Sequence, residues 1–129
     1  MIAIFGKRFP EAIRTARPPF IVEYQHDPKN KFKFSDTTTD DEWIAKVAAV
    51  NWVIFSHDRK FHVRLPEISA IKQYQAGCFY LPGANWTTWE KTRHFMRFYD
   101  GIASRIDATT KPFVYRLAPT GKFTKISIP

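Results

Sequence analysis

Residues 39–58 read TDDEWIAKVAAVNWVIFSHD, in which acids open a helix-like segment and an apolar run ends close to Asp58. Helical spacing covers 40–50, and the apolar run over 52–56 is typical of a buried strand. A helix over 40–50 spans roughly 16 Å at 1.5 Å per residue, and a strand over 52–56 returns over about the same distance. We therefore expect the start of the helix and the end of the strand at one edge of a parallel sheet.

The carboxylates at the two ends of this stretch have the chemistry of a site for a hard divalent cation. They are Asp40, Asp41, Glu42 and Asp58. Acidic side chains at the carboxyl edge of an open α/β sheet lie where such folds bind their ligands. Mg²⁺ and Mn²⁺ prefer oxygen ligands and retain several waters, so two or three carboxylates are sufficient. Such an ion can make a water nucleophilic and offset charge on a phosphodiester, so we predict Mg or Mn as the cofactor.

A structural interpretation of the same acids remains open. Thr39 followed by Glu42 three residues later matches a capping box, and acids in a first turn favour the helix dipole. Asp58 can equally start a turn. The neighbouring His57 and His62 are candidate ligands or bases, or else solvated loop residues, because no spacing typical of a zinc site accompanies them.

Composition narrows the class of protein. The 129 residues, 44% hydrophobic and 16% aromatic, favour a single domain over 1–129. No apolar run is long enough for a membrane span, and charge interrupts the start MIAIFGKRF too soon for a signal peptide, so we expect a cytoplasmic protein. A lone cysteine, Cys78, excludes an internal disulfide and a thiolate zinc cluster, and its apolar neighbours predict that it is buried. Neither a glycine-rich phosphate loop nor a Gly-x-Ser-x-Gly elbow occurs, which sets those enzyme classes aside.

The formal net charge of +8 favours a polyanionic partner, with nucleic acid ahead of an acidic protein. Cations lie on both sides of the acids, and we predict that they hold the phosphates of RNA. These residues are Lys29, Lys31 and Lys33, which alternate with phenylalanines, and Arg59, Lys60 and Arg64, which follow Asp58. The alternative is that the excess of cations serves only solubility.

Strand-like and helix-like segments alternate along the chain. Apolar, strand-like runs occupy 2–5, 20–24, 52–56, 78–81, 113–117 and 122–128, and the last two are joined by a turn at 118–121. Helices are predicted at 7–16, at 40–50, at 66–75 before a terminating Gly77, and from 87 or 88 to about 106. This alternation predicts a three-layer α/β domain with a mostly parallel central sheet and a C-terminal antiparallel hairpin. The long last helix opens with a capping box at Thr87 and Glu90, and its aromatic face is a candidate surface for a homodimer.

Several of these segments together resemble a known family. They are GKRF and EAI near residue 6, DDEWI at 40–44, NWVIFSHD at 51–58, and PFVYRL at 112–117. From about 6 to 126 the chain resembles the PIN-like domains of the VapC ribonuclease toxin group. The resemblance implies a metal-dependent endoribonuclease in which acids at the sheet edge hold Mg²⁺ or Mn²⁺ and activate water.

Matched position by position, the resemblance assigns Asp40 as the acid at the helix start, Asp58 as the acid after the central strand, and Glu42 as a helper. Members of this group are often toxins restrained by a cognate antitoxin, so the resemblance implies such a partner here.

The start of the chain departs from that pattern. Such domains usually open with an apolar strand that ends in an aspartate, and Ile2, Ala3 and Ile4 stand in that place here. Either the sequence begins late or the site has lost one of its metal acids. The alternative function is therefore a catalytically impaired PIN-like protein that binds RNA or a partner protein through its basic surface.

Overall fold

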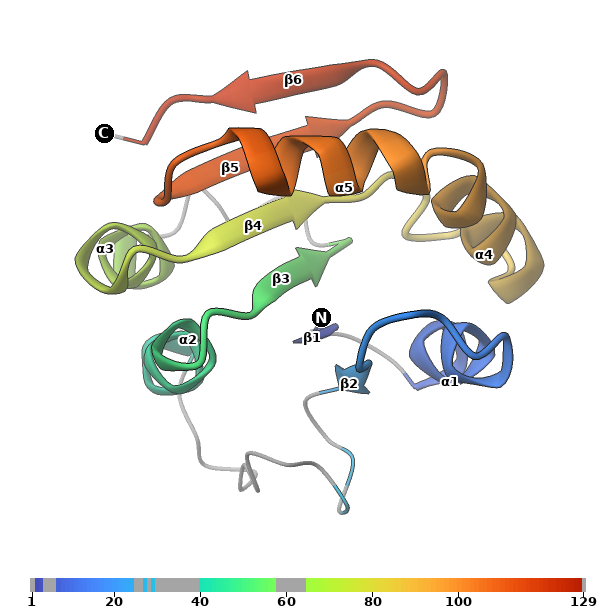
Figure 1. Ribbon diagram of the computed structural model, residues 1–129, viewed down its shortest axis with the longest axis horizontal. Helices are drawn as coiled ribbons and strands as arrows, with labels where there is room; N and C mark the ends of the chain where they lie inside the picture. Colours follow the sequence, from blue (N-terminus) through green and yellow to red (C-terminus); the bar gives the residue numbers. More distant parts are fainter. Residues whose placement is uncertain are drawn as a thin grey trace.

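Apolar segments from along the whole chain form the strands of one mixed sheet (Figure 1). The computed structural model describes residues 2–3, 7–24, 27, 29, 40–57 and 65–128, with the backbone alone at 2–3, 40–41 and 65–67. Within these ranges the strands are β1 (Ile2–Ala3), β2 (Glu23–Tyr24), β3 (Val53–Ser56), β4 (Gly77–Tyr80), β5 (Phe113–Leu117) and β6 (Phe123–Ile126). The helices are α1 (Arg8–Thr15), α2 (Asp40–Ala49), α3 (Leu65–Tyr74), α4 (Thr88–Arg97) and α5 (Tyr99–Ala108).

The strands of the described ranges lie in the order β2-β1-β3-β4-β5-β6. β1 pairs in parallel with β2 and with β3, parallel pairing continues through β4 to β5, and β6 returns antiparallel to β5. This topology confirms the predicted α/β class, including the C-terminal hairpin. The strand order reverses between β1 and β3, because the chain adds β2 on one side of β1 and then β3 on the other.

Helices cover both faces of the sheet and produce the predicted three layers. α2 and α3 close one face over a core of Trp43, Ile44, Val47, Ile54, Ala70, Ile71, Ala76, Cys78 and Val114. α1, α4 and α5 close the other over a core of Phe9, Ile13, Val22, Val53, Phe55, Phe79, Leu81, Phe95, Ile102, Phe113 and Leu117. β3 contributes to both cores, and this explains its unbroken apolar sequence, since a central parallel strand is buried on both faces. The predicted burial of Cys78 is confirmed.

Left-handed residues end the helices that turn back toward the sheet. Asn51 after α2 and Gln75 after α3 have φ values of +63° and +54°. The backbone N–H groups of Trp52 and Ala76 then donate to carbonyls of the preceding helices, as in a helix C-cap. Gly77, expected to terminate α3, lies instead in β4, where a Cβ would stand 2.6 Å from Cζ of Phe113. That glycine therefore makes room for the Phe113 ring.

The single long helix predicted from 87 or 88 to about 106 is wrong. The chain breaks at Phe98, which has φ −106° and ψ 12° and separates α4 from α5. The Phe98 ring contacts that of His94 at 4.9 Å and lies close to the glycine of the β5–β6 turn. α5 lies along the sheet while α4 packs on α1 (Figure 1). One straight helix cannot make both sets of contacts.

Among the described residues, no helix is both long enough and apolar enough to span a bilayer.

Candidate functional site

The carboxyl edge of the sheet near β1 and β3 is the point where ligands of such folds bind, because the strand order reverses there. α2 begins at Asp40, and a short link joins its end to β3, which ends at Ser56. The predicted helix and strand over 40–56 are thus confirmed within one residue at each end. Glu42 is exposed in the first turn of α2. The side chain of Asp40 and the whole of Asp58 fall outside the described ranges, so their proximity stays a prediction.

His57, which follows β3, is buried rather than a solvated loop residue. The edge of its ring meets that of Phe9 at 5.5 Å between centroids. Burial lowers the pKa of His57 to about 3, and the nearby charges of Lys91 and His94 act in the same direction. The imidazole is therefore neutral near pH 7 and is held within the core at the end of β3.

A charged cluster between α1 and β2 was not predicted from the sequence. Arg14 donates from Nε to the carbonyl of Val22 at 2.7 Å and from its two terminal nitrogens to Glu23 at 2.9 Å and Asp27 at 3.0 Å. Both carboxylates belong to buried residues. Because the guanidinium already binds these two acids, the cluster fastens the edge strand to α1 and is not a candidate metal site.

Neighbouring groups complete this cluster. The Tyr24 hydroxyl donates to Glu11 at 2.9 Å, and this bond is the main cause of a raised Tyr24 pKa. The backbone N–H of Lys29 donates to Asp27 at 2.9 Å and, together with Arg14, holds the pKa of Asp27 below its usual value. The residue types at 11, 14, 23 and 27 are ordinary for a protein surface. Only the spacing of Glu11 and Arg14 on one helix face offered a local signal.

The basic residues predicted to bind nucleic acid are described only in part. The side chain of Lys29 is exposed. Lys31, Lys33, Arg59, Lys60 and Arg64 fall in segments that the structure does not describe, and their role stays a prediction. Among the described side chains, no three or more His, Cys, Asp or Glu residues gather closely enough to hold a metal ion.

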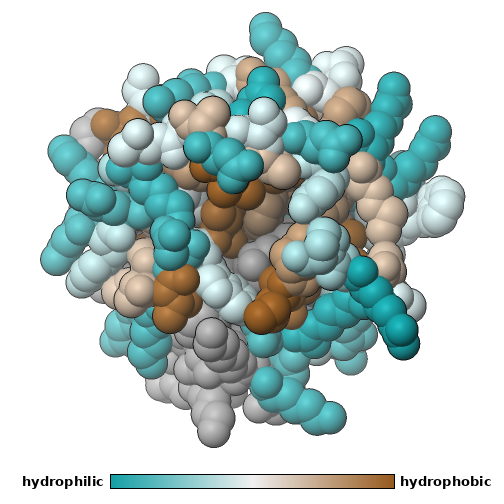
Figure 2. Space-filling model, viewed as in Figure 1, coloured by the Kyte–Doolittle hydropathy of each residue, from teal (hydrophilic) through white to brown (hydrophobic). Residues whose placement is uncertain are grey.

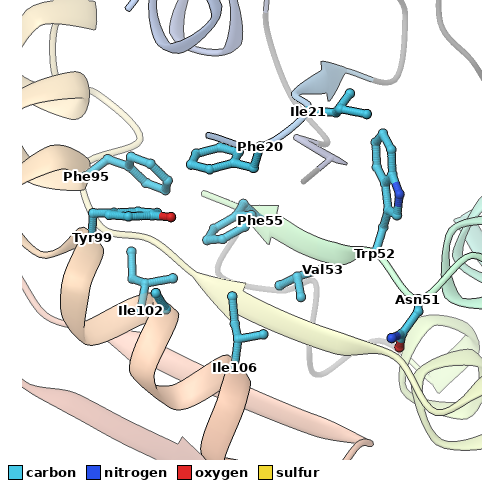
Figure 3. Close-up of a pocket in the computed structure, with 11 residues that line it drawn as sticks. Phe20, Ile21, Asn51, Trp52, Val53, Phe55, Phe95, Tyr99, Ile102 and Ile106 are labelled. Atoms are coloured by element: carbon cyan, nitrogen blue, oxygen red, sulfur yellow. The ribbon is translucent and has the colours of Figure 1, made fainter. Parts of the chain in front are cut away.

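An apolar pocket of about 300 Å³ opens on the face covered by α1, α4 and α5 (Figure 3). Its lining residues are Phe20, Ile21, Asn51, Trp52, Val53, Phe55, Phe95, Tyr99, Ile102, Ala103 and Ile106. On the molecular surface, seen from the same side as in Figure 1, apolar side chains surround a hollow near the middle (Figure 2). Phe20 and Ile21, expected in a strand, precede the shorter β2 and line this pocket instead. Asn51 and Trp52 place one end of the pocket at the amino end of β3, whereas Phe55 and Phe95 line it toward the carboxyl end of that strand.

A comparison with protein families finds a similarity that covers the segment with the predicted acid site. Residues 22–83 match the family model of the PIN like domain. This segment is similar to a PIN-like domain. It runs from the start of β2 to the loop after β4 and contains Asp40, Glu42 and Asp58. The match covers slightly less than half of the chain and does not distinguish the VapC group from other PIN-like proteins. No significant match was found among curated proteins or solved structures.

Proposed function

We propose that this protein is a metal-dependent endoribonuclease of the PIN-like toxin type, which hydrolyses RNA phosphodiesters. One observation carries the proposal: the PIN-like segment 22–83 contains a helix that begins at Asp40 and leads directly into the strand before Asp58. In a parallel sheet this connection favours placement of both acids at the carboxyl edge, beside the reversal of strand order.

The donor set agrees with Mg²⁺ or Mn²⁺. Asp40 and Asp58 would hold the ion through carboxylate oxygens, which hard cations prefer, and Glu42 would assist from the exposed first turn of α2. When bound, such an ion supplies an activated water and offsets phosphate charge. The protein's own part is to keep the acids at the edge, with the α2–β3 link setting their spacing, and to hold the phosphates with cations.

The test is cleavage of a labelled single-stranded RNA with Mn²⁺ or with EDTA. We expect Mn²⁺-dependent cleavage by the wild-type protein and a loss of at least 100-fold in Asp58→Asn, because loss of a key group costs several powers of ten in rate. Asp107→Asn, an exposed acid on α5, is the matched control and should cleave like the wild type. Equal cleavage by Asp58→Asn and the wild type would remove Asp58 from the mechanism.

RNA or partner binding without catalysis is the second candidate function, and the residues that follow β1 favour it. β1 is followed by Ile4, Phe5 and Gly6, with no carboxylate in the sequence before Glu11. In this case Lys29, Lys31, Lys33, Arg59, Lys60 and Arg64 would hold RNA phosphates in the absence of metal. A titration against salt in EDTA tests this, since phosphate-driven binding weakens steeply as salt rises. A flat response would contradict it.

As a toxin, the protein would have a cognate antitoxin and would arrest growth when expressed alone. Relief of that arrest by co-expression of a neighbouring gene is the expected result. Self-association is a separate proposal, which light scattering of the purified protein tests directly.

A further inference from the structure

α4 presents two different sides, and one of them packs into the core. Phe95 packs into the core against Phe9 and Phe55, with ring centroids 5.7 Å and 5.6 Å apart. Trp89, Arg93 and Arg97 follow one another at four-residue intervals and share another side of the helix. Trp89 is 72% exposed, and both arginines are exposed. We call these three residues the α4 ridge, along which each step rises about 6 Å.

A cavity of about 200 Å³ adjoins the ridge and shares its arginines. Its lining residues are Trp86, Glu90, Arg93, His94 and Arg97. The one acid, Glu90, accepts from the backbone N–H and the hydroxyl of Thr87 in the capping box. Its carboxylate is therefore engaged at the helix start. Within the described part of the chain neither guanidinium has a carboxylate partner, so the cavity and the ridge present net positive charge.

α4 also lies at the carboxyl edge of the sheet, where the proposed acids belong (Figure 1). His94 donates from Nε2 to the carbonyl of Ala118, just beyond β5, at 3.1 Å. Phe95 contacts Phe55 of β3 and Phe9 of α1, and the Phe9 ring in turn meets His57, the residue before Asp58. Through these side-chain contacts, α4 lies within a few residues of the end of β3, where the proposed cleavage site begins.

We propose that the α4 ridge binds single-stranded RNA next to the acid edge, with a base stacked on Trp89 and phosphates held by Arg93 and Arg97. The inference rests on the proposed action on RNA and adds a subsite to it. Indole faces stack on any unpaired base, and a stacked base is worth about 5- to 150-fold in affinity. A duplex hides its base faces, so Trp89 selects single strands. Proteins that bind single-stranded RNA typically combine an exposed aromatic ring with cations that have no carboxylate partner.

The test measures binding of a fluorescein-labelled twelve-nucleotide single-stranded RNA by anisotropy in EDTA, so that cleavage does not intervene. We expect Trp89→Ala to weaken binding at least fivefold and Trp89→Phe to retain most of it, because a phenyl ring still stacks. Tyr74→Ala is the matched control, since Tyr74 is 43% exposed on α3, across the sheet. It should bind within twofold of the wild type. When the same RNA is in a duplex, Trp89→Ala and the wild type should bind it with equal affinity.

Equal RNA binding by Trp89→Ala and the wild type, equal losses in Trp89→Ala and Tyr74→Ala, or no RNA binding by the wild type would each overturn the inference. So would light scattering that shows a dimer which Trp89→Ala converts to a monomer, because the ridge would then be a protein interface. The nuclease proposal fails separately. Absence of Mn²⁺-dependent cleavage, together with weakened binding in Trp89→Ala, would reject the nuclease and keep the α4 ridge.

Discussion

Arg14 on α1 and Arg93 on α4 have the same side chain in opposite surroundings. Arg14 donates to a carbonyl and to the carboxylates of Glu23 and Asp27, which are largely buried. Arg93 is exposed and lies between a cavity and Trp89. A guanidinium that neutralises buried acids holds a fold together, whereas one directed to solvent costs little to keep and is available to an anionic ligand. The number of cations alone therefore says little about binding.

The largest effect expected from this comparison is on stability. Arg14→Ala should lower the free energy of unfolding by about 3 kcal/mol, because it leaves two buried carboxylates without a cation. We place the value at the lower end of the usual range because the Arg14 side chain is itself 36% exposed. Urea denaturation measures it. Arg93→Ala is the matched control and should change stability by less than about 0.5 kcal/mol. A similar loss of unfolding free energy in Arg14→Ala and Arg93→Ala would contradict the proposed difference between the two arginines.

The second effect is on RNA affinity. The double variant Arg93→Gln with Arg97→Gln should bind single-stranded RNA about tenfold more weakly at low salt. Its plot of log K against log salt should be shallower by about 1.4, since each lost phosphate contact on a single strand removes about 0.7. Lys72→Gln with Lys125→Gln, two exposed cations that line one cavity beside α3 and β6, supplies the control. An equal change of slope in the control would show that only net charge matters.

A smaller effect concerns what holds α4 itself. The Thr87 hydroxyl accepts from the backbone N–H of Glu90 at 3.2 Å, and the Glu90 carboxylate accepts in return. Loss of such a cap costs about 1 kcal/mol, so Thr87→Ala should lower the melting temperature by a few degrees. Ser104→Ala on the exposed side of α5 should leave it unchanged. If Thr87→Ala destabilises the fold as much as Arg14→Ala does, α4 depends on its cap as strongly as β2 depends on its ion pairs.

The smallest effect is a pH dependence in the Arg14 cluster. The N–H of Lys29 and the Arg14 guanidinium hold the pKa of Asp27 below its ordinary value of 3.8. A lowered folded-state pKa stabilises the fold above the ordinary value, and that stabilisation is lost as the pH falls through the folded-state pKa. Asp27→Asn should therefore be less stable than the wild type at pH 6, and the difference should shrink near pH 2. Thermal melting at both pH values checks this, and a constant difference would contradict it.

The sequence predicted the parts of the site that depend on neighbouring residues, but not those that depend on contacts between residues far apart in the chain. The segments around Glu42 and Ser56 follow from helical spacing and an apolar run, and the structure agrees. Arg14, Glu23 and Asp27 escaped prediction because the edge strand and α1 meet only in the folded chain. Trp89, part of the long aromatic helix that the spacing predicts, is 72% exposed, because helical spacing does not show which side of α4 meets the core. The proximity of Asp40 to Asp58 remains a prediction.

By itself the sequence determined the alternation of helices and strands, the capping box at Thr87 and the C-terminal hairpin, since periodicity, caps and turns act over a few residues. Only the tertiary structure decided that Phe98 divides a helix, that Gln75 rather than Gly77 takes the left-handed conformation, and which arginines meet carboxylates. These outcomes depend on side chains far apart in the chain competing for the same space and the same charges. A local pattern carries no record of that competition.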